Sequence, residues 1–272
     1  MTVERIDRRF AALKAAGKAG LVTYIMAGHP DLDATLDILK GMPAAGADLI
    51  ELGFPFSDPM AEGPTIQRAA EHALKNGTRI KDVFELVRRF RETDPDTPLI
   101  LMGYMNPLES LGYEAWAAAM ADCGADGAII VDCPPEEADG VSDAFDAHDV
   151  ALIRLATPTS DAHRLETLVR RTRGFIYYVS VTGVTGVKSA DPAAIAGAVS
   201  QVRETGKLPV AVGFGIRTAE AAAAVARIAD AAVVGSVLVD EINNSLPESA
   251  TVSVKVLAKV RELAEAVHSA RI

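Results

Sequence analysis

The chain reads DLIELGFPFSDPMAEGP from Asp48 to Pro64. The first residues form a short apolar run typical of a buried strand, with Glu51 near its C-terminal end. A loop punctuated by Gly and Pro follows and carries Asp58 and Glu62, and Pro64 has the position of a first helical residue. Since an ionised carboxylate is seldom buried without a partner or a task, Glu51 is expected either to form a structural ion pair or to act in catalysis.

Short apolar runs alternate with helical patterns on both sides of this stretch. Continuous apolar runs of four to six residues are typical of parallel strands that helices cover on the outside. The expected strands are 21–26, 48–52, 99–102, 127–131, 151–155, 175–180, 209–212 and 231–234. Eight such units in roughly 250 residues favour a closed (β/α)8 barrel, the TIM barrel, over an open doubly wound sheet.

Boundary signals place the helices between these strands. Capping residues, Pro at first helical positions and Gly at helix ends support the assignments. The expected helices are 1–17, a segment after Asp31 or Asp33 that Pro43 and Gly46 end, 64–75, 79–92, 112–122, 134–147, one that Ser160 caps and Gly174 ends, 191–206, a segment after Thr218, and 247–269. The N-terminal helix is additional to the barrel and is expected to pack on it. No low-complexity linker interrupts the chain, so residues 1–272 are expected to form one domain.

The composition limits the partners and the location. A net charge of −10 argues against nucleic acid or an anionic membrane as a partner. No apolar segment approaches the roughly 20 residues of a membrane span, and the N-terminus lacks the apolar core of a signal peptide. Cys123 and Cys133 match no metal or redox motif and are expected to be structural thiols of a reducing compartment. A cytoplasmic protein is therefore expected.

The ends of the expected strands carry a phosphate signal. In barrels of this kind the site lies at the C-terminal ends of the strands. Glycines cluster after the sixth, seventh and eighth strands, and Ser236 begins the segment that follows the eighth. Glycine lets backbone N–H groups approach an anion closely, and a helix N-terminus adds a favourable dipole. One Gly-x-Gly alone would favour a tight turn, whereas three such loops together favour a phosphate site.

The carboxylates of the opening stretch have two different expectations. Glu51 shares one side of its strand with Leu49 and Gly53, because side chains alternate with a period of two. If Glu51 points into the barrel mouth, desolvation should raise its pKa, which suits an acid/base group that works near neutrality. Asp58 and Glu62 lie in a polar loop, where a solvated surface charge is the first expectation.

Other chemistries lack the residues that they need. None of the nine lysines lies in an expected strand or at its C-terminal end, so a Schiff-base nucleophile is missing. The five histidines show no metal-ligand spacing, and no G-x-S-x-G elbow occurs. Carboxylate acid/base catalysis on a phosphorylated substrate remains, in an apolar mouth that suits a flat ring. The expected lining residues are Tyr24, Met102, Ile129, Tyr177 and Phe214.

The segment from Ile50 to Pro64 closely resembles the signature of the tryptophan synthase alpha subunit family. The likeness spans essentially the whole chain, including the N-terminal helix, and further matches are Met105–Pro107, Val131–Pro134, Ser180–Gly186 and Gly213–Ile216. That family cleaves indole-3-glycerol phosphate to indole and glyceraldehyde 3-phosphate, a retro-aldol step of tryptophan biosynthesis that uses no cofactor. The resemblance thus implies a carbon–carbon lyase with a single TIM-barrel domain.

The resemblance also implies individual roles. Glu51 would be the principal acid/base, which protonates indole C3 and helps to remove the proton of the adjacent glycerol hydroxyl. Glu62 would hold the indole N–H as positive charge develops on the ring, although the family more commonly has Asp at this position. Thr185 matches a lid residue that helps to position the catalytic Glu. The implied phosphate ligands are Gly186, Gly215, Gly235 and Ser236, and the implied indole pocket is the apolar mouth described above.

The resemblance finally implies a protein partner. The interface residues of the family match Pro55, Ser57, Asp58 and Asn106. Their partner would be the beta subunit, a pyridoxal-phosphate enzyme that receives indole through a tunnel in an α2β2 tetramer. Two alternatives stay open. Another phosphate-binding barrel of amino-acid biosynthesis, such as an isomerase or indole-glycerol-phosphate synthase, would place Lys, Cys or Asp at other strand ends. A non-catalytic partner subunit would not need both glutamates.

Overall fold

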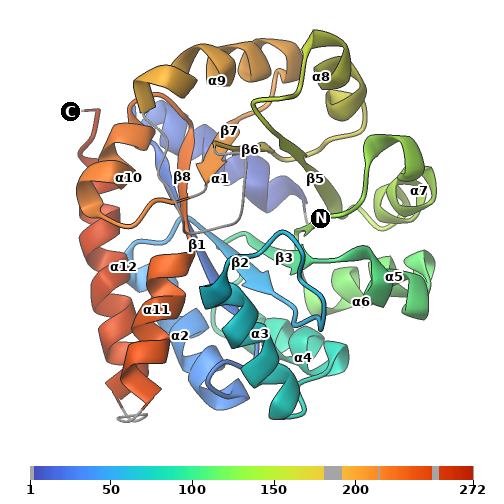
Figure 1. Ribbon diagram of the computed structural model, residues 1–272, viewed down its shortest axis with the longest axis vertical. Helices are drawn as coiled ribbons and strands as arrows, with labels where there is room; N and C mark the ends of the chain where they lie inside the picture. Colours follow the sequence, from blue (N-terminus) through green and yellow to red (C-terminus); the bar gives the residue numbers. More distant parts are fainter. Residues whose placement is uncertain (1–2, 181–191, 214, 247–250, 272) are drawn as a thin grey trace.

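Eight parallel strands close into a barrel in the order of the chain, which confirms the expected (β/α)8 architecture (Figure 1). The computed structural model describes residues 3–180, 192–213, 215–246 and 251–271. The strands are β1 (Gly20–Met26), β2 (Leu49–Gly53), β3 (Leu99–Gly103), β4 (Gly127–Ile130), β5 (Ala151–Ala156), β6 (Ile176–Val179), β7 (Val210–Gly213) and β8 (Ala231–Val234). Closure follows from the pairing of β1 with both β2 and β8.

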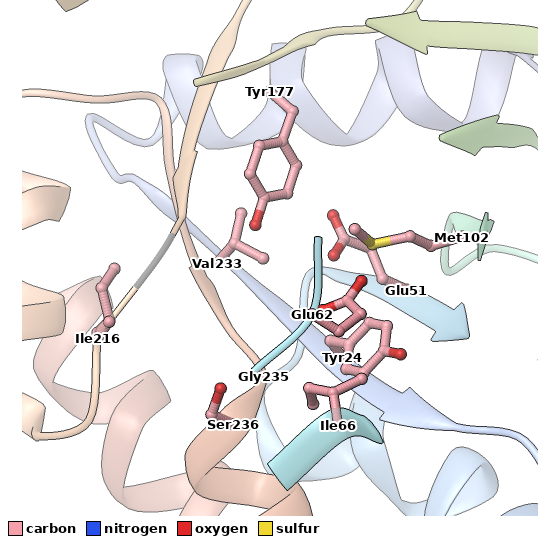
Figure 2. Close-up of a pocket in the computed structure, with 11 residues that line it drawn as sticks. Tyr24, Glu51, Glu62, Ile66, Met102, Tyr177, Ile216, Val233, Gly235 and Ser236 are labelled. Atoms are coloured by element: carbon pink, nitrogen blue, oxygen red, sulfur yellow. The ribbon is translucent and has the colours of Figure 1, made fainter. Parts of the chain in front are cut away.

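Side chains that point into the barrel form a layered interior. A buried apolar layer contains Val22, Leu49 and Ile100, and helix α1 (Val3–Ala15) closes the N-terminal end of the barrel with Ile6 and Phe10 in the same cluster. At the other end of the strands, polar side chains enter the interior and a cavity opens (Figure 2). The alternation of side chains along each strand therefore separates a packed base from a functional mouth.

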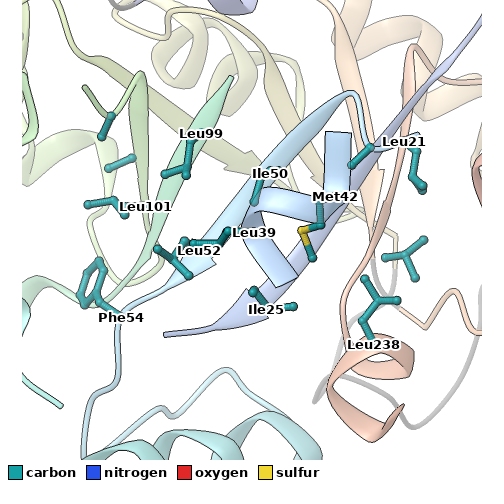
Figure 3. Close-up of a cluster of buried hydrophobic side chains, with 14 of the residues drawn as sticks. Leu21, Ile25, Leu39, Met42, Ile50, Leu52, Phe54, Leu99, Leu101 and Leu238 are labelled. Carbon is teal, nitrogen blue, oxygen red and sulfur yellow. The ribbon is translucent and has the colours of Figure 1, made fainter. Parts of the chain in front are cut away.

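Side chains that point outward form a second core between the strands and the surrounding helices. Along β2, Ile50 and Leu52 belong to this outer cluster, whereas Leu49 belongs to the inner one. Figure 3 shows Leu39 and Met42 of the helix after β1 packed among these strand residues. Burial on both faces explains why the strands read as continuous apolar runs.

The helices surround the barrel as Figure 1 shows. They are α1, α2 (Leu32–Ala45), α3 (Pro64–Lys75), α4 (Ile80–Arg91), α5 (Met105–Leu111), α6 (Tyr113–Cys123), the 3-10 turn η1 (Pro135–Glu137), α7 (Asp139–Ala147), α8 (Ala162–Val169), α9 (Pro192–Gly206), α10 (Ala219–Ala226), α11 (Ser236–Ser245) and α12 (Val252–His268). Within the described part of the chain, no helix has the length and apolarity needed to cross a bilayer.

Several expected helix boundaries were wrong. Asp161 caps α8 through a hydrogen bond from Arg164 N, so Ser160 is not the cap, and α8 ends at Val169 instead of Gly174. Pro43 lies inside α2, which ends only where Gly46 adopts a φ of 105°. The single helix expected after 134 is a 3-10 turn followed by α7.

Two helices were missed altogether. Asn106-Pro107 looks like a turn in the sequence, but Pro107 lies in the first turn of α5, where a proline costs no helical hydrogen bond. The segment after Gly235 forms α11, in which Leu238, Val239 and Ile242 are buried at helical spacing. The second omission matters for function because α11 begins at the mouth of the barrel.

Candidate active site

A cavity at the C-terminal ends of the strands contains the strongest cluster of chemically active side chains. It encloses about 470 Å3 of empty space, part of it open to solvent. Its lining residues are Tyr24, Glu51, Glu62, Ile66, Met102, Tyr177, Gly215, Ile216, Val233, Gly235 and Ser236. Figure 2 shows both glutamate side chains entering this cavity, with the Tyr177 ring on one side and Ser236 across from them. The structure thus brings together eight residues that the sequence singled out: Tyr24, Glu51, Glu62, Met102, Tyr177, Gly215, Gly235 and Ser236.

Glu51 projects from β2 into the barrel mouth. Its neighbours in the register of the sheet are Tyr24 on β1 and Ile100 on β3. Only 1% of Glu51 is exposed, and its Oε1 has no hydrogen-bond partner among the described residues. Burial, and secondarily the charge of Glu62, raise the pKa of Glu51 from 4.5 to about 8. A carboxyl group in this state holds its proton at neutral pH and can deliver it to a bound ligand.

Glu62 is buried at the end of the loop that follows β2, with 7% of its surface exposed. The first expectation, a solvated surface charge, is therefore wrong for this residue. Burial raises the pKa of Glu62 to about 7, and a hydrogen bond from Tyr104 opposes part of that rise. Glu62 is consequently the more readily ionised member of the pair. One cavity thus holds two carboxyl groups with raised pKa values, about 8 for Glu51 and about 7 for Glu62.

Tyr104 holds the Glu62 loop in place, a role that the sequence did not suggest. The residue caps the N-terminus of α5 and is 3% exposed. Its hydroxyl accepts a hydrogen bond from the backbone N–H of Ala61 at 3.1 Å and donates one to Glu62. The Tyr104 ring also stacks on Phe56, with 5.4 Å between centroids. The available signal was its position directly after β3, at the end of the barrel that holds the site.

The N-terminus of α11 forms the wall across from the glutamates. Gly235 precedes this ten-residue helix, Ser236 begins it, and both line the cavity with Gly215. The first N–H groups of a helix have no partner within the helix, and the macrodipole favours an anion there. An anionic group is therefore attracted to this wall and repelled from the carboxylate side, which fixes the orientation of a ligand that has one charged end.

Glycines at two strand ends make room for the tyrosines of the cavity. A Cβ at Gly53 would lie 2.2 Å from the Tyr24 hydroxyl oxygen, and a Cβ at Gly213 would lie 2.0 Å from that of Tyr177. Any side chain at either position would thus displace a tyrosine from the cavity wall. At Gly213 this close approach of Tyr177 is a structural reason for glycine.

Comparison with known proteins identifies the family. The family model "Tryptophan synthase alpha chain" matches residues 10–268. The chain is 65% identical over 272 residues to the tryptophan synthase alpha chain of Caulobacter vibrioides. That alignment covers all of this chain and 99% of the Caulobacter protein. It is 62% identical over 271 residues to that of Phenylobacterium zucineum, across 100% and 98% of the two chains. The chain belongs to the tryptophan synthase alpha chain family.

Solved structures agree with this assignment. Tryptophan synthase subunit alpha from Legionella pneumophila superposes with a TM-score of 0.91 at 42% identity and covers 97% of this chain and 98% of that one. A chain of Mycobacterium tuberculosis tryptophan synthase gives a TM-score of 0.88 at 35% identity, with coverage of 97% and 98%. Tryptophan synthase alpha chains cleave indole-3-glycerol phosphate to indole in tryptophan biosynthesis, so this chain is a lyase with aldolase activity. The other phosphate-binding barrels that the sequence left open are thereby excluded.

The remaining residues that the sequence singled out lie elsewhere. Ile129 is fully buried in the inner apolar cluster, next to Met102 in the sheet, and is not among the lining residues of the cavity. Thr185, Gly186 and Phe214 lie outside the described residues. Within the described ranges, no group of three or more His, Cys, Asp and Glu residues could hold a metal ion.

The residues expected at the interface surround the mouth of the barrel. Ser57, Asp58 and Asn106 are exposed, and Pro55 is half-buried. In the same loop, 79% of Met60 is exposed.

Proposed function

We propose that Glu51 and Glu62 divide the chemistry of indole-3-glycerol phosphate cleavage, with Glu51 as the proton donor and acceptor and Glu62 as the fixed anion. One observation carries this proposal: two buried carboxyl groups, both with pKa values raised by burial, enter one cavity whose far wall is a helix N-terminus. The phosphate of the substrate would bind at Gly235 and Ser236. The indole would then lie between Tyr24, Met102 and Tyr177, within reach of both glutamates.

The proposed reaction balances without an external reagent. The protonated Glu51 gives its proton to indole C3, and the ionised Glu62 accepts a hydrogen bond from the indole N–H as positive charge develops on the ring. The bond between C3 and the glycerol carbon then breaks, and its electrons return to the indole ring. The glycerol hydroxyl becomes the aldehyde of glyceraldehyde 3-phosphate and loses its proton to Glu51. Glu51 ends the cycle protonated, and no cofactor takes part.

The pH dependence of kcat/KM follows from the two carboxyl groups. The competent form has Glu62 ionised and Glu51 protonated, so kcat/KM should rise through the pKa of Glu62 at about 7 and fall through that of Glu51 at about 8. Indole formation by the alpha subunit alone, measured from about pH 5.5 to about pH 9.5, is therefore expected to give a narrow bell. A flat profile across this range would contradict the division of roles.

Replacing Tyr104 by Phe tests the support of Glu62. The variant removes one hydrogen bond to the Glu62 carboxylate and leaves Ala61 N–H without its acceptor, so kcat/KM should fall about tenfold. Because the lost hydrogen bond lowers the pKa of Glu62, the rising limb of the pH profile should also move to higher pH. Tyr113→Phe is the matched control, since it removes a hydroxyl of α6 that donates to Glu109 on α5. A loss of rate with an unmoved rising limb would indicate a purely structural role for Tyr104.

The proposed partner is a beta subunit that docks at the rim of the barrel, over Pro55, Ser57, Asp58 and Asn106. The exposure of Ser57, Asp58 and Asn106 supports this surface, and exposed Met60 would add an apolar contact. We place the assembly in the cytoplasm as an α2β2 tetramer, with pyridoxal phosphate bound only by the beta subunit. Phe56 of this rim stacks on Tyr104, which donates a hydrogen bond to Glu62. Binding of the partner would therefore change the position of Glu62 through these two residues.

The decisive experiment measures indole released from indole-3-glycerol phosphate, with and without the purified beta subunit. Release of indole by the alpha subunit alone, together with a faster rate in the complex, is the expected result. The mass of the complex in sedimentation equilibrium tests the tetramer. A chain that releases no indole in either setting but still binds the beta subunit would be the non-catalytic partner that the sequence also allowed.

A further inference from the structure

A second cavity lies outside the barrel, behind β4 and β5. Figure 1 shows β5 between α7 and α8, and both helices contact this strand. The cavity has a volume of about 320 Å3, which is at the lower end of the usual size of small-molecule sites. Its walls include Ile130, Leu152 and Leu168, which belong to the core between strands and helices. It shares no lining residue with the cavity that holds Glu51 and Glu62.

Arg154 is the unusual residue of this outer cavity. It is on β5, lines the cavity and is only 7% exposed. Its Nη2 donates to the Ser142 hydroxyl at 3.2 Å, and the Cys133 thiol is a second neutral partner. Among the residues that the structure describes, no carboxylate forms an ion pair with Arg154. A guanidinium group has five N–H donors in a planar fork, so most of its hydrogen-bonding capacity is directed at neutral neighbours or at the cavity.

Arg91 shows how this chain satisfies a buried arginine that serves the fold. The Arg91 guanidinium pairs with Asp126 at 2.6 Å and donates to the backbone carbonyls of Asp94, Thr97 and Gly124. Arg154 lacks an equivalent set of partners in the described structure. Burying a cation without a counter-charge is costly, and burial lowers the pKa of Arg154. An anion that entered the cavity would remove this cost.

The other charges near the cavity define which anion fits. Arg164 is already paired with Glu136, and Asp132, at the exposed rim, accepts a hydrogen bond from Met105 N at 2.7 Å. Arg154 is the only buried cation among the residues that line the cavity, and Ile130, Leu152 and Leu168 supply aliphatic walls beside it. The other donors of the lining already have partners, since Thr157 is bonded to Thr159 and Ser160 and Arg164 is paired with Glu136. A multiply charged phosphate would need more free donors than Arg154 alone provides. A single carboxylate matches the guanidinium fork through two parallel hydrogen bonds.

We propose that this outer cavity binds a small organic carboxylate, with the carboxylate on Arg154 and its apolar body among Ile130, Leu152 and Leu168. The site is independent of the catalytic glutamates, so the proposal stands whether or not their assigned roles hold.

Cyclohexanecarboxylate is a suitable probe because it has one carboxylate and an aliphatic body. Its binding to the full-length chain can be measured by isothermal titration calorimetry at low ionic strength, and by the NMR signal of the Arg154 side-chain Nε–H. Arg154→Gln should weaken binding at least about tenfold. Arg170→Gln is the matched control, since it removes an exposed arginine at the end of α8 and should bind like the wild type.

Several results would overturn the proposal. The first is an Arg154 Nε–H signal that does not change at saturating probe. The second is equal affinity of the wild type and of Arg154→Gln for cyclohexanecarboxylate. The third is binding of inorganic phosphate at Arg154 as tight as that of the carboxylate. If Arg154→Gln does not fold, the wild-type NMR titration still decides. Arg154→Lys then adds a second comparison, because it keeps the charge but loses the two parallel hydrogen bonds and should bind more weakly than wild type.

Discussion

Glu51→Gln is expected to lower kcat for indole formation by about 10²- to 10⁴-fold, the range that a general acid/base group contributes. Glutamine keeps the shape of the side chain and can neither deliver a proton to indole C3 nor accept one from the glycerol hydroxyl. Since the buried Glu51 is largely protonated at neutral pH, the neutral amide should disturb the site little. Rates of indole release with the beta subunit present, measured at saturating substrate, test this prediction.

Two controls separate chemistry from folding in this variant. Glu71→Gln makes the same change at an exposed position on α3 and should retain full activity. The stability of Glu51→Gln should also respond to pH. The folded-state pKa of Glu51 is raised to about 8 from 4.5, so ionisation of this group opposes folding as pH rises through that interval. The variant should therefore melt at a higher temperature than wild type at pH 8, and should show no such gain at pH 4.5. Substantial turnover by Glu51→Gln would refute the assigned role.

Glu62→Ala should also cause a severe loss, of about 10²- to 10³-fold in kcat, because it removes a preorganised charge that interacts most strongly with the transition state. The buried position of Glu62 strengthens this expectation, since a charge acts more strongly where water is excluded. The measurement is again indole release, at a pH above the pKa of Glu62, about 7, so that the wild-type carboxylate is ionised.

Glu62→Asp is the informative companion variant. It keeps the charge and shortens the side chain by one methylene, and we expect it to stay within about tenfold of wild type. Tyr104 can still donate to the shorter carboxylate if the loop moves slightly inward. An inactive Glu62→Asp enzyme, with normal folding and normal binding of the beta subunit, would show that the loop geometry of this chain requires glutamate.

The fold and one of the two proposed catalytic glutamates, Glu51, could be predicted from short stretches of sequence. The apolar run around Glu51 marks a strand, and period-two alternation places that residue on the same side as Leu49. The structure confirms both features, together with the raised pKa. The missed helix α11 did leave a signal, because Leu238, Val239 and Ile242 recur at helical spacing after Gly235. Ile129 shows a limit of such patterns, since alternation gives the inward side but not the depth at which a side chain lies.

The sequence by itself determined the order of the strands, the closed barrel and the side of β2 on which Glu51 stands, because these depend on local propensity and on a repeating pattern. Only the tertiary structure decided the state of Glu62. The polar sequence of its loop predicts a solvated side chain. In the structure Glu62 is buried, and Tyr104, from the end of another strand, donates a hydrogen bond to the Glu62 carboxylate. The opposition of Glu62 and α11 across one cavity likewise joins segments more than a hundred residues apart. Burial and electrostatics at such a site arise from contacts between distant parts of the chain, which no local pattern records.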